Sequence, residues 1–425
     1  MQASRLSELG SRLRVLFIND TARNGGPGRS LHSILKFMDP RLIHRTVVLP
    51  RRGPVSELLE RGRAADEVII EPNLVENPIE PWRRAMARQD FDASCGLKSL
   101  RLFGNVGRAM LGFARLRDLA RRGGYDLIYC NGTSADFAGG VLSLASEVPT
   151  LWHVRYTSIP ALVAPIHRRL AASTGVRRIV CVSQAAASLF PHCRDKVRVV
   201  HNAVDTDEFD PAVVEPRLRR ELGVSDDAVV FGSHGRVLRR KGYVELLHAA
   251  KRSLSRMTDA EVARVRFAIV GDTPEDFFPD HLAECKDLAR TLGIADKVHF
   301  LGFQKDVRPY VADFDVAVVP SVYPDPLPRS VIESMALGKP VIAFDVGGVG
   351  EMMEDGVTGT LVASSPSGVD EMASQIVRYA RHPELRARQG AAARAHVARS
   401  FDARAHARAI ENEILGVVGE SQAIA

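Results

Sequence analysis

Short runs of β-branched residues alternate with segments of helical periodicity along this chain, and no other feature constrains its fold as strongly. The alternation predicts parallel α/β sheets, in which a crossover helix follows each strand. In the first half the expected strands are 14–18, 46–49, 67–70, 127–130, 150–154 and 178–182. In the second half they are 197–200, 229–232, 266–270, 298–301, 316–319 and 341–344. We therefore predict an α/β fold with two doubly wound, Rossmann-like domains facing a cleft.

The expected division is 1–200, 201–395 and a final helical segment, 396–425, that packs back onto the first domain. The two halves differ in charge. Residues 1–200 hold 30 Lys and Arg against 17 Asp and Glu, a net charge of +13, whereas 201–425 hold 27 against 34, a net charge of −7. The basic first half suggests an anionic partner, which could be a phosphate, an acidic glycan, nucleic acid or an anionic membrane.

Several classes of protein are disfavoured by composition. The five cysteines are odd in number and form no C-x-x-C pair, so neither a disulfide framework nor a zinc site is expected. No apolar stretch approaches the ~20 residues of a membrane-spanning helix, and the first apolar run, 15–18, is too short for a signal sequence. We therefore expect a cytoplasmic protein. Nucleic acid is not an expected partner, because aromatic residues make up only 6% and no recognition motif is present.

Two carboxylates, Asp325 and Glu333, lie eight residues apart around an expected helix start. The run 316–319 predicts a buried strand, the prolines after it predict a loop, and 329–337 has helical spacing that ends at Gly338. A helix start can bind a phosphate. Glu333 lies among apolar residues and needs hydroxyl or N–H partners, which a ribose diol would supply. Alternatively, Glu333 is a solvated helix residue and Asp325 forms a turn.

Two other strand-end loops carry groups suited to anions or sugars. After 229–232, Arg236 and Lys241 can both reach an anion at the strand end; a solvated basic turn is the alternative. After the first strand, Gly25 and Gly26 would let the backbone approach a phosphate or sugar closely, although turn formation also explains such glycines. This turn lacks the G-x-G-x-x-G spacing, which argues against a dinucleotide site.

The stretch from 320 to 341 resembles the signature of retaining glycosyltransferases of family 4. The matching residues are Pro320-Ser321, Glu333, Met335-Ala336, Gly338 and Pro340-Val341. The resemblance implies the glycosyltransferase B fold, with an acceptor-side domain at 1–200 and a nucleotide-sugar-binding domain at 201–395. This chain departs from the signature at two places. Asp325 replaces a Glu, and Leu327-Pro328 replaces Phe-Gly, so one backbone N–H is lost at Pro328.

The resemblance also implies roles for residues of the second domain. Arg236 and Lys241 would hold the donor diphosphate and act in catalysis, and Glu333 would bind the ribose. Asp325 would meet hydroxyls of the transferred sugar, and because it is shorter than Glu, the identity or pose of that sugar is open. The other residues assigned to donor binding here are Leu327, Arg329, Ser330 and Phe303.

In the first domain, His153 resembles the family histidine that lies beside the donor sugar, and it is assigned to catalysis; a satisfied loop histidine is the alternative. The turn at Gly25 and Gly26 would close over the donor. Arg29 could meet an acceptor phosphate.

The implied reaction is a retaining transfer of a sugar from a nucleoside diphosphate to a hydroxyl acceptor, without a metal or another cofactor. The leaving phosphate would take the acceptor proton. A lipid-linked or glycan acceptor, in cell-surface polysaccharide or glycolipid synthesis, would fit the basic first half. Two other functions remain open: a catalytically silent partner subunit that binds sugar nucleotides, and a sugar-nucleotide epimerase.

A basic amphipathic region spans 82–84 and 97–119. Each Lys or Arg near an anionic lipid surface gains about 1 kcal/mol, so peripheral binding to the inner face of the cytoplasmic membrane is one expectation. The alternative is a helix that packs on its own domain and exposes a basic face.

Overall fold

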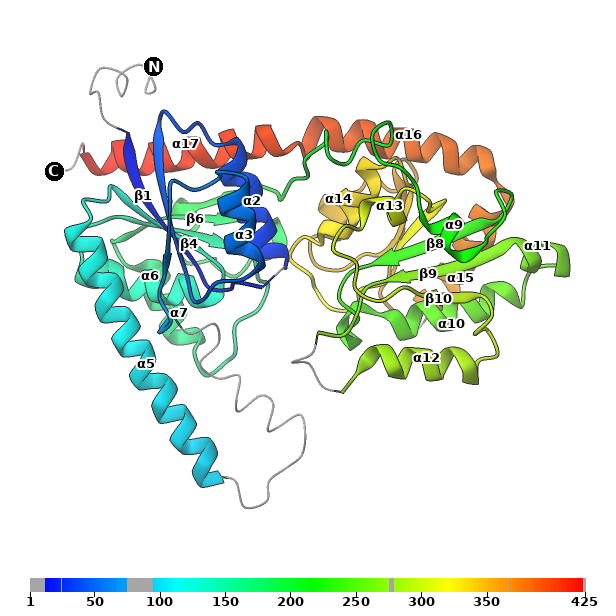
Figure 1. The fold of residues 1–425 in the computed structure, drawn as a ribbon, viewed down its shortest axis with the longest axis horizontal. Coiled ribbons are helices and arrows are strands. Elements are labelled where there is room, and N and C mark those ends of the chain that lie inside the picture. Colours follow the sequence, from blue (N-terminus) through cyan, green and yellow to red (C-terminus); the bar gives the residue numbers. More distant parts are fainter. Residues whose placement is uncertain (1–11, 24, 75–94, 275–278, 366, 423–425) are drawn as a thin grey trace. The chain divides into compact units, whose positions relative to one another are not determined.

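The computed structural model describes residues 12–23, 25–74, 95–274, 279–365 and 367–422; the side chains of 95–106 and 422 lie outside this description. The chain forms two compact units (Figure 1). Unit 1 comprises Met1–Asn202 and Ala403–Ala425, and unit 2 comprises Ala203–Asp402. Each unit is built on its own parallel sheet.

The sheet of unit 1 has seven strands in the order β3-β2-β1-β4-β5-β6-β7, and all neighbouring strands are parallel. The strands are β1 (Leu13–Asn19), β2 (Ile43–Leu49), β3 (Glu67–Ile70), β4 (Leu127–Asn131), β5 (Thr150–Val154), β6 (Val176–Cys181) and β7 (Val197–Val199). β4 and β5 are buried along their whole length, as expected for strands covered on both faces. The strand order reverses between β1 and β4, so polar residues at the ends of these strands lie at a topological switch point.

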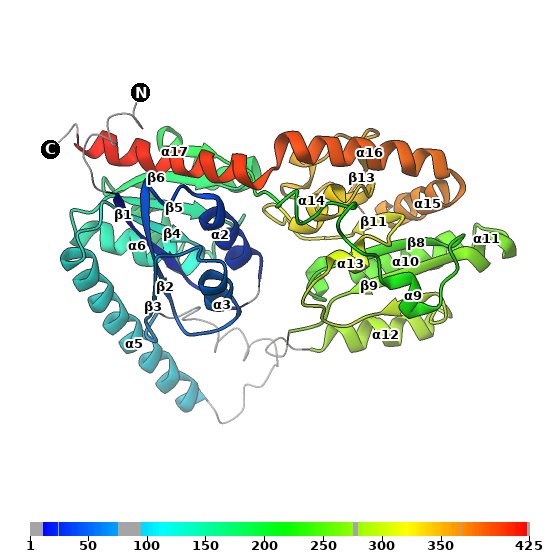
Figure 2. The ribbon, with the colours of Figure 1, turned by 45° about the horizontal axis from the view of Figure 1, so that its top comes forward.

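Helices cover both faces of this sheet (Figures 1 and 2). They are α2 (Gly26–Phe37), α3 (Pro54–Arg61), α5 (Cys95–Arg122), α6 (Thr133–Ala145), α7 (Ala164–Ala172), α8 (Gln184–Ala187), the short helix η1 (Arg194–Lys196) and α17 (Ala403–Gln422). On one face, α2, α3 and α17 pack over a core that includes Leu31 and Ile410. On the other, α5, α6 and α7 pack over a core that includes Leu116 and Leu142. The terminal helix is thus part of the core of unit 1, although all of unit 2 precedes it in the sequence.

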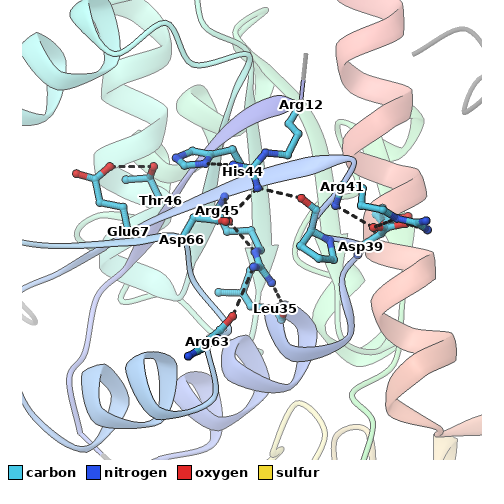
Figure 3. Close-up of polar contacts among 12 residues, drawn as sticks. Arg12, Leu35, Asp39, Arg41, His44, Arg45, Thr46, Arg63, Asp66 and Glu67 are labelled. Carbon is cyan, nitrogen blue, oxygen red and sulfur yellow. Dashed lines mark hydrogen bonds and ion pairs between the residues drawn. The ribbon is translucent and has the colours of Figure 1, made fainter. Parts of the chain in front are cut away.

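A cluster of ion pairs lies at the amino-terminal ends of β1, β2 and β3 (Figure 3). Arg45 is only 6% exposed; its backbone N and its Nε donate to Asp66 Oδ2 at 2.8 and 3.0 Å, and its Nη1 donates to Leu35 O at 2.8 Å. Arg12 Nη1 donates to Asp66 Oδ1 at 3.1 Å. Burial raises the pKa of Asp66, but the hydrogen bonds from Arg45 outweigh it and hold that pKa below its ordinary value. The cluster joins the outer strands of the sheet to α2.

The sheet of unit 2 has six strands in the order β10-β9-β8-β11-β12-β13, all parallel. They are β8 (Val229–His234), β9 (Val265–Val270), β10 (Val298–Phe300), β11 (Val316–Val319), β12 (Val341–Phe344) and β13 (Gly359–Val362). The three strands β8, β11 and β12 are neighbours and fully buried. Because all strands run in one direction, the loops after these three leave from the same edge of the sheet.

The helices of unit 2 also form two layers. They are α9 (Leu218–Leu222), η2 (Arg239–Lys241), α10 (Tyr243–Leu254), α11 (Asp259–Arg264), α12 (His281–Thr291), α13 (Arg308–Val311), α14 (Arg329–Ala336), η3 (Val349–Glu351), α15 (Gly368–Arg381) and α16 (Pro383–Ser400). α10, α12 and α15 share a core with the sheet that includes Leu246, Leu282 and Met372. α14 packs on β11, β12 and α16. The predicted α/β fold with two Rossmann-like domains is therefore confirmed.

The two strands β7 and β13 lie at sheet edges, and the sequence predicts only the first of them. The run at 197–200 forms a strand, β7, which pairs with β6 as the last strand of the sheet of unit 1. The sequence pattern does not predict β13, because its run of four residues begins with Gly359 directly after a glycine-containing turn. A strand so short at the edge of a sheet gives little periodic signal.

The expected basic amphipathic region lies only partly within the described residues. Positions 82–84 and the side chains of 95–106 lie outside them. Farther along α5, Leu116 packs in the core of unit 1, while Met110 and Leu111 are 70% and 48% exposed. In the part of the chain that the structure describes, no helix combines the length and the apolar character that a membrane span requires.

Candidate functional site

The candidate site lies in unit 2, where the segments after β8, β11 and β12 leave the sheet side by side. Backbone hydrogen bonds join these segments. Val322 N donates to Arg240 O at 3.1 Å, and Gly348 N donates to Asp325 O at 2.9 Å. The loop after β11 is therefore held between the loops after β8 and β12, at the edge where ligands of open α/β sheets bind.

Two glycines make this close approach possible. Gly242 has a φ of 76°, and a Cβ added there would lie 1.6 Å from Pro320 O. Gly347 has a φ of 61°, and its Cβ would lie 2.2 Å from Asp325 O. Both the left-handed backbone and the missing side chain are needed at these two positions. A larger residue at either would push the three loops apart.

Lys241 and Asp325, which the sequence assigns to different parts of a donor, contact each other. Lys241 Nζ donates to Asp325 Oδ2. The two side chains are 19% and 13% exposed, so the pair is largely shielded from water. The sequence pattern does not predict this pair; Asp325 has a cationic partner within the protein itself.

Glu333 lies in the first half of α14 and is 5% exposed, as its apolar neighbours predict. Its two carboxylate oxygens have different partners. Arg329 Nε donates to Oε1 at 2.9 Å, and His234 Nε2 lies 3.1 Å from Oε2. Arg329 and His234 therefore supply partners for this buried charge from within unit 2.

The other predicted donor-binding residues of unit 2 differ in exposure. Arg236 is exposed on the loop after β8, in the same segment as Lys241. Ser330 is half-buried in the first turn of α14. Leu327 is buried, with 3% of its surface exposed. Phe303 is 61% exposed on the segment after β10, which is two strands from β8 in the sheet.

In unit 1, polar side chains gather at the switch point of the sheet. Asn131 Nδ2 donates to Asn19 Oδ1 at 2.5 Å and to Pro27 O at 3.2 Å. Arg155 Nε donates to Asn131 Oδ1 at 2.7 Å, and its Nη1 donates to Asn202 Oδ1. Arg155 therefore links the ends of β4 and β5 to the segment that follows β7.

His153, at the end of β5, is fully buried. Its Nδ1 forms a hydrogen bond with the hydroxyl of Tyr129, and its ring lies 6.3 Å from that of His406 on α17. Within the described residues its Nε2 is buried without a hydrogen-bond partner. Burial, with a further contribution from the charge of Arg155, holds the pKa of His153 well below its ordinary value. The imidazole is therefore neutral at pH 7, able to form hydrogen bonds but not to carry a charge.

Gly25 and Gly26 lie at the start of α2, with Gly25 as its N-cap. Neither has a positive φ, and a Cβ would meet nothing closer than 4.0 Å at Gly25 and nothing within 4 Å at Gly26. Neither turn geometry nor packing thus explains these glycines, and the open space around them is compatible with close approach of a ligand. Arg29 is half-buried in the first turn of the same helix, where its N donates to Gly25 O at 3.0 Å.

Sequence reasoning assigned no role to two residues that are central to these networks, His234 and Arg155. Each lies at the carboxyl end of a strand, or just beyond it, and the structure gives each a contact with a predicted site residue. A titratable or cationic residue at the end of an apolar strand was the available signal. Among residues with described placement, no group of three His, Cys, Asp or Glu side chains is arranged to hold a metal ion.

Two family profiles match the chain, and each match falls largely within one of the two units. Residues 24–208 match the profile described as Glycosyltransferase Family 4, and 214–396 match the profile described as Glycosyl transferases group 1. The chain belongs to the group 1 and family 4 glycosyltransferases. The resemblance inferred from Glu333 and its neighbours is thereby confirmed.

Individual glycosyltransferases of this family are moderately similar to the chain. A D-inositol 3-phosphate glycosyltransferase of Kribbella flavida is 35% identical over 205 residues, 47% of this chain and 46% of that protein. An uncharacterized glycosyltransferase of Methanocaldococcus jannaschii is 30% identical over 255 residues, 56% of this chain and 62% of that protein. The chain therefore spans about half the length of the curated relatives it matches.

A solved structure supports the fold over nearly the whole chain. The Anabaena protein Alr3699/HepE, crystallised in complex with UDP-glucose, superimposes with a TM-score of 0.74. The match covers 94% of this chain and 99% of that one, at 24% identity. This likeness establishes the glycosyltransferase B fold.

Proposed function

We propose that this protein is a retaining glycosyltransferase that moves a sugar from a nucleoside diphosphate sugar to a hydroxyl acceptor. The observation that carries the proposal is the convergence of the loops after β8, β11 and β12, which brings Lys241 onto Asp325 and joins Glu333 to His234. Cationic and anionic side chains meet there at the strand ends of a Rossmann-like unit, the usual place for a nucleotide in this architecture.

The donor would be held by groups of unit 2. Arg236 and Lys241 supply positive charge for the diphosphate, Glu333 accepts hydrogen bonds from the ribose, and Asp325 accepts from hydroxyls of the sugar. Leu327, Arg329 and Ser330 border the donor at the start of α14. Support for a nucleotide-sugar donor comes from family membership and from the UDP-glucose complex of the Anabaena protein.

In the proposed reaction the bond between the anomeric carbon and the diphosphate oxygen breaks, and a bond from that carbon to the acceptor oxygen forms on the same face. The acceptor proton passes to the leaving phosphate, so no protein nucleophile, metal or cofactor takes part. Negative charge grows on the diphosphate in the transition state, and preorganised cations such as Lys241 and Arg236 stabilise it. The anomeric centre gains oxocarbenium character, as in other glycosyl transfers.

The residues of unit 1 complete the proposal. Gly25 and Gly26 allow the backbone at the start of α2 to approach a sugar or phosphate, and Arg29 offers a charge to an acceptor phosphate. His153 acts through hydrogen bonding as a neutral imidazole, which agrees with its lowered pKa. The Kribbella relative is named for an inositol phosphate acceptor, which makes a phosphorylated polyol one class to test here.

The biological setting we propose is polysaccharide or glycolipid synthesis on the cytoplasmic side of an anionic membrane, with a lipid-linked or glycan acceptor. On α5, the exposed Met110 and Leu111 lie close in sequence to the basic Arg108, Arg115 and Arg117. Liposome flotation with and without anionic lipid, at low and high salt, tests this location. A protein that stays unbound at low salt would refute it.

The decisive experiment for the activity is a panel of UDP-, GDP- and ADP-sugars, assayed for slow donor hydrolysis and for thermal stabilisation of the protein. Release of free nucleoside diphosphate is expected for a transferase. Binding in calorimetry without turnover, once acceptors have been supplied, would instead indicate a silent partner subunit. Conversion of the donor sugar without release of nucleoside diphosphate would indicate an epimerase.

A further inference from the structure

We infer that Arg329 and His234 are positioning residues that orient the Glu333 carboxylate toward a ribose diol. The inference rests on the proposed function and deepens it, because it specifies the donor as a ribonucleotide and identifies the groups that maintain this preference. It follows from the two different partners of a buried carboxylate.

Arg329 is fixed at two points. Its Nε donates to Glu333 Oε1 at 2.9 Å, and its Nη1 donates to Ala203 O at 3.0 Å. The guanidinium is planar, so two contacts with different atoms define its orientation as well as its position. The side chain is 15% exposed, so water competes weakly for these bonds. The planar guanidinium of Arg329 therefore sets the position of one carboxylate oxygen.

His234 sets the position of the other oxygen. It is the last residue of β8, and its side chain is 5% exposed. Its Nε2 lies 3.1 Å from Glu333 Oε2. An ionised carboxylate can only accept, so the imidazole nitrogen is the donor. Because His234 comes from the sheet and Arg329 from α14 itself, the carboxylate is held from two elements and its side-chain torsions are restricted.

Such a held carboxylate is suited to a diol. A carboxylate can accept about four hydrogen bonds, so one group can accept from protein donors and from the hydroxyls of a ribose. Preorganisation of this kind lowers the entropy lost on binding. If either partner is removed, Glu333 gains rotamer freedom and the 2′ hydroxyl should lose most of its contribution to affinity.

A purely structural role for these two contacts gives a different expectation. If Arg329 and His234 only stabilised α14, their loss would lower the melting temperature and weaken all nucleotides alike. The ratio of affinities for a ribonucleotide and its 2′-deoxy analogue separates the two roles, because a general loss of stability leaves that ratio unchanged.

The test is calorimetric titration of the full-length protein with UDP, GDP and ADP, followed by the 2′-deoxy form of the one that binds most tightly. The variants are Arg329→Lys, which keeps the charge without the fork, His234→Leu, and His234→Gln, which keeps an N–H donor. Arg217→Lys is the matched control, because Arg217 also pairs with a glutamate four residues later, Glu221, on the short helix α9.

We expect the wild type and Arg217→Lys to prefer the ribonucleotide by about tenfold, the worth of a hydrogen bond to a charged group. Arg329→Lys and His234→Leu should reduce this ratio toward one, and His234→Gln should largely restore it. Wild-type ratios in both Arg329→Lys and His234→Leu would overturn the inference and leave the proposed function intact. Failure of the wild type to bind any of the nucleotides would overturn both. If Arg329→Lys does not fold, the affinity ratios of His234→Leu and His234→Gln test the inference by themselves.

Discussion

Lys241 and Asp325 form an ion pair between residues that lie 84 positions apart in the sequence. The pair joins the loop after β8 to the loop after β11, and each partner is mostly shielded from solvent. A diphosphate that binds Lys241 would therefore meet an ammonium group that already has an anionic partner. Donor binding would exchange or share that partner, which couples the affinity for the diphosphate to the position of Asp325.

Replacing Lys241 with Ala should reduce turnover without unfolding the protein. Loss of one group that stabilises developing charge typically costs roughly 10²–10³ in rate, and we expect a decrease of this order in steady-state nucleoside diphosphate release. Lys251→Ala, at an exposed position of α10, is the control and should retain full activity. Equal rates for wild type and Lys241→Ala would remove Lys241 from the mechanism.

Changing Asp325 to Glu should alter which sugar is preferred. The longer side chain can keep its bond to Lys241 while moving its carboxylate about one methylene closer to a bound sugar. We expect a changed order of kcat/KM across the donor panel, because the nucleotide contacts are the same for every donor and only the contact with the sugar differs among them. An unchanged order of donors would show that Asp325 does not meet the sugar.

Glu333→Gln should weaken donor binding. The variant keeps the shape of the side chain but removes the negative charge that Arg329 and His234 contact, and hydrogen bonds to charged groups are worth about 1.5–3 kcal/mol each. Turnover at fixed donor concentration should fall at least about tenfold. Glu221→Gln, in the i,i+4 pair with Arg217, is the matched control. Full activity of Glu333→Gln would contradict the assignment of Glu333 to the ribose.

Arg45→Met should destabilise unit 1 while leaving nucleotide affinity unchanged. The substitution removes the main partner of Asp66 at the sheet edge of Figure 3. Breaking a fully buried ion pair typically costs about 3–5 kcal/mol, and the cost here should be below that range because Arg12 also donates to Asp66. Urea unfolding followed by circular dichroism measures the loss. A change below about 0.5 kcal/mol, the range of ordinary surface substitutions, would show that the pair contributes little.

The stabilisation that Arg45→Met removes should depend on pH. The pKa of Asp66 in the folded protein lies below its ordinary value, so the stabilisation it provides is complete above the ordinary pKa, about 3.9, and is lost as the pH falls through the lower value. The stability difference between wild type and Arg45→Met should therefore be larger at pH 7 than near pH 3. A difference that grows on acidification would have the wrong sign for this mechanism.

The strands of the central sheets were the most predictable part of the fold. Val316–Val319 and Val341–Phe344 have the expected bounds, because fully buried parallel strands appear as continuous β-branched runs between breakers. β7 was also predicted as a strand, although its sequence does not indicate which strand it pairs with. Glu333 could be expected to be buried because apolar residues flank it on α14.

The partners within the site were not predictable from the sequence. His234 and Glu333 are 99 positions apart, and no local pattern indicates that the end of β8 reaches α14. The pairing of Lys241 with Asp325 depends on how closely two loops approach, which in turn depends on the contact that Gly242 permits with Pro320 O. Propensity and periodicity describe single segments, whereas these contacts depend on the packing of several.

The position of α17 has a consequence for biosynthesis. A fragment ending at Asn202 would lack Ile410, Ile414 and Val417, which fill one face of the first sheet, whereas Ala203–Asp402 is an uninterrupted stretch. During translation the second unit can become compact while the first still exposes an apolar surface to the cell. The first unit can reach its final form only after α17 has been synthesised and has left the ribosome.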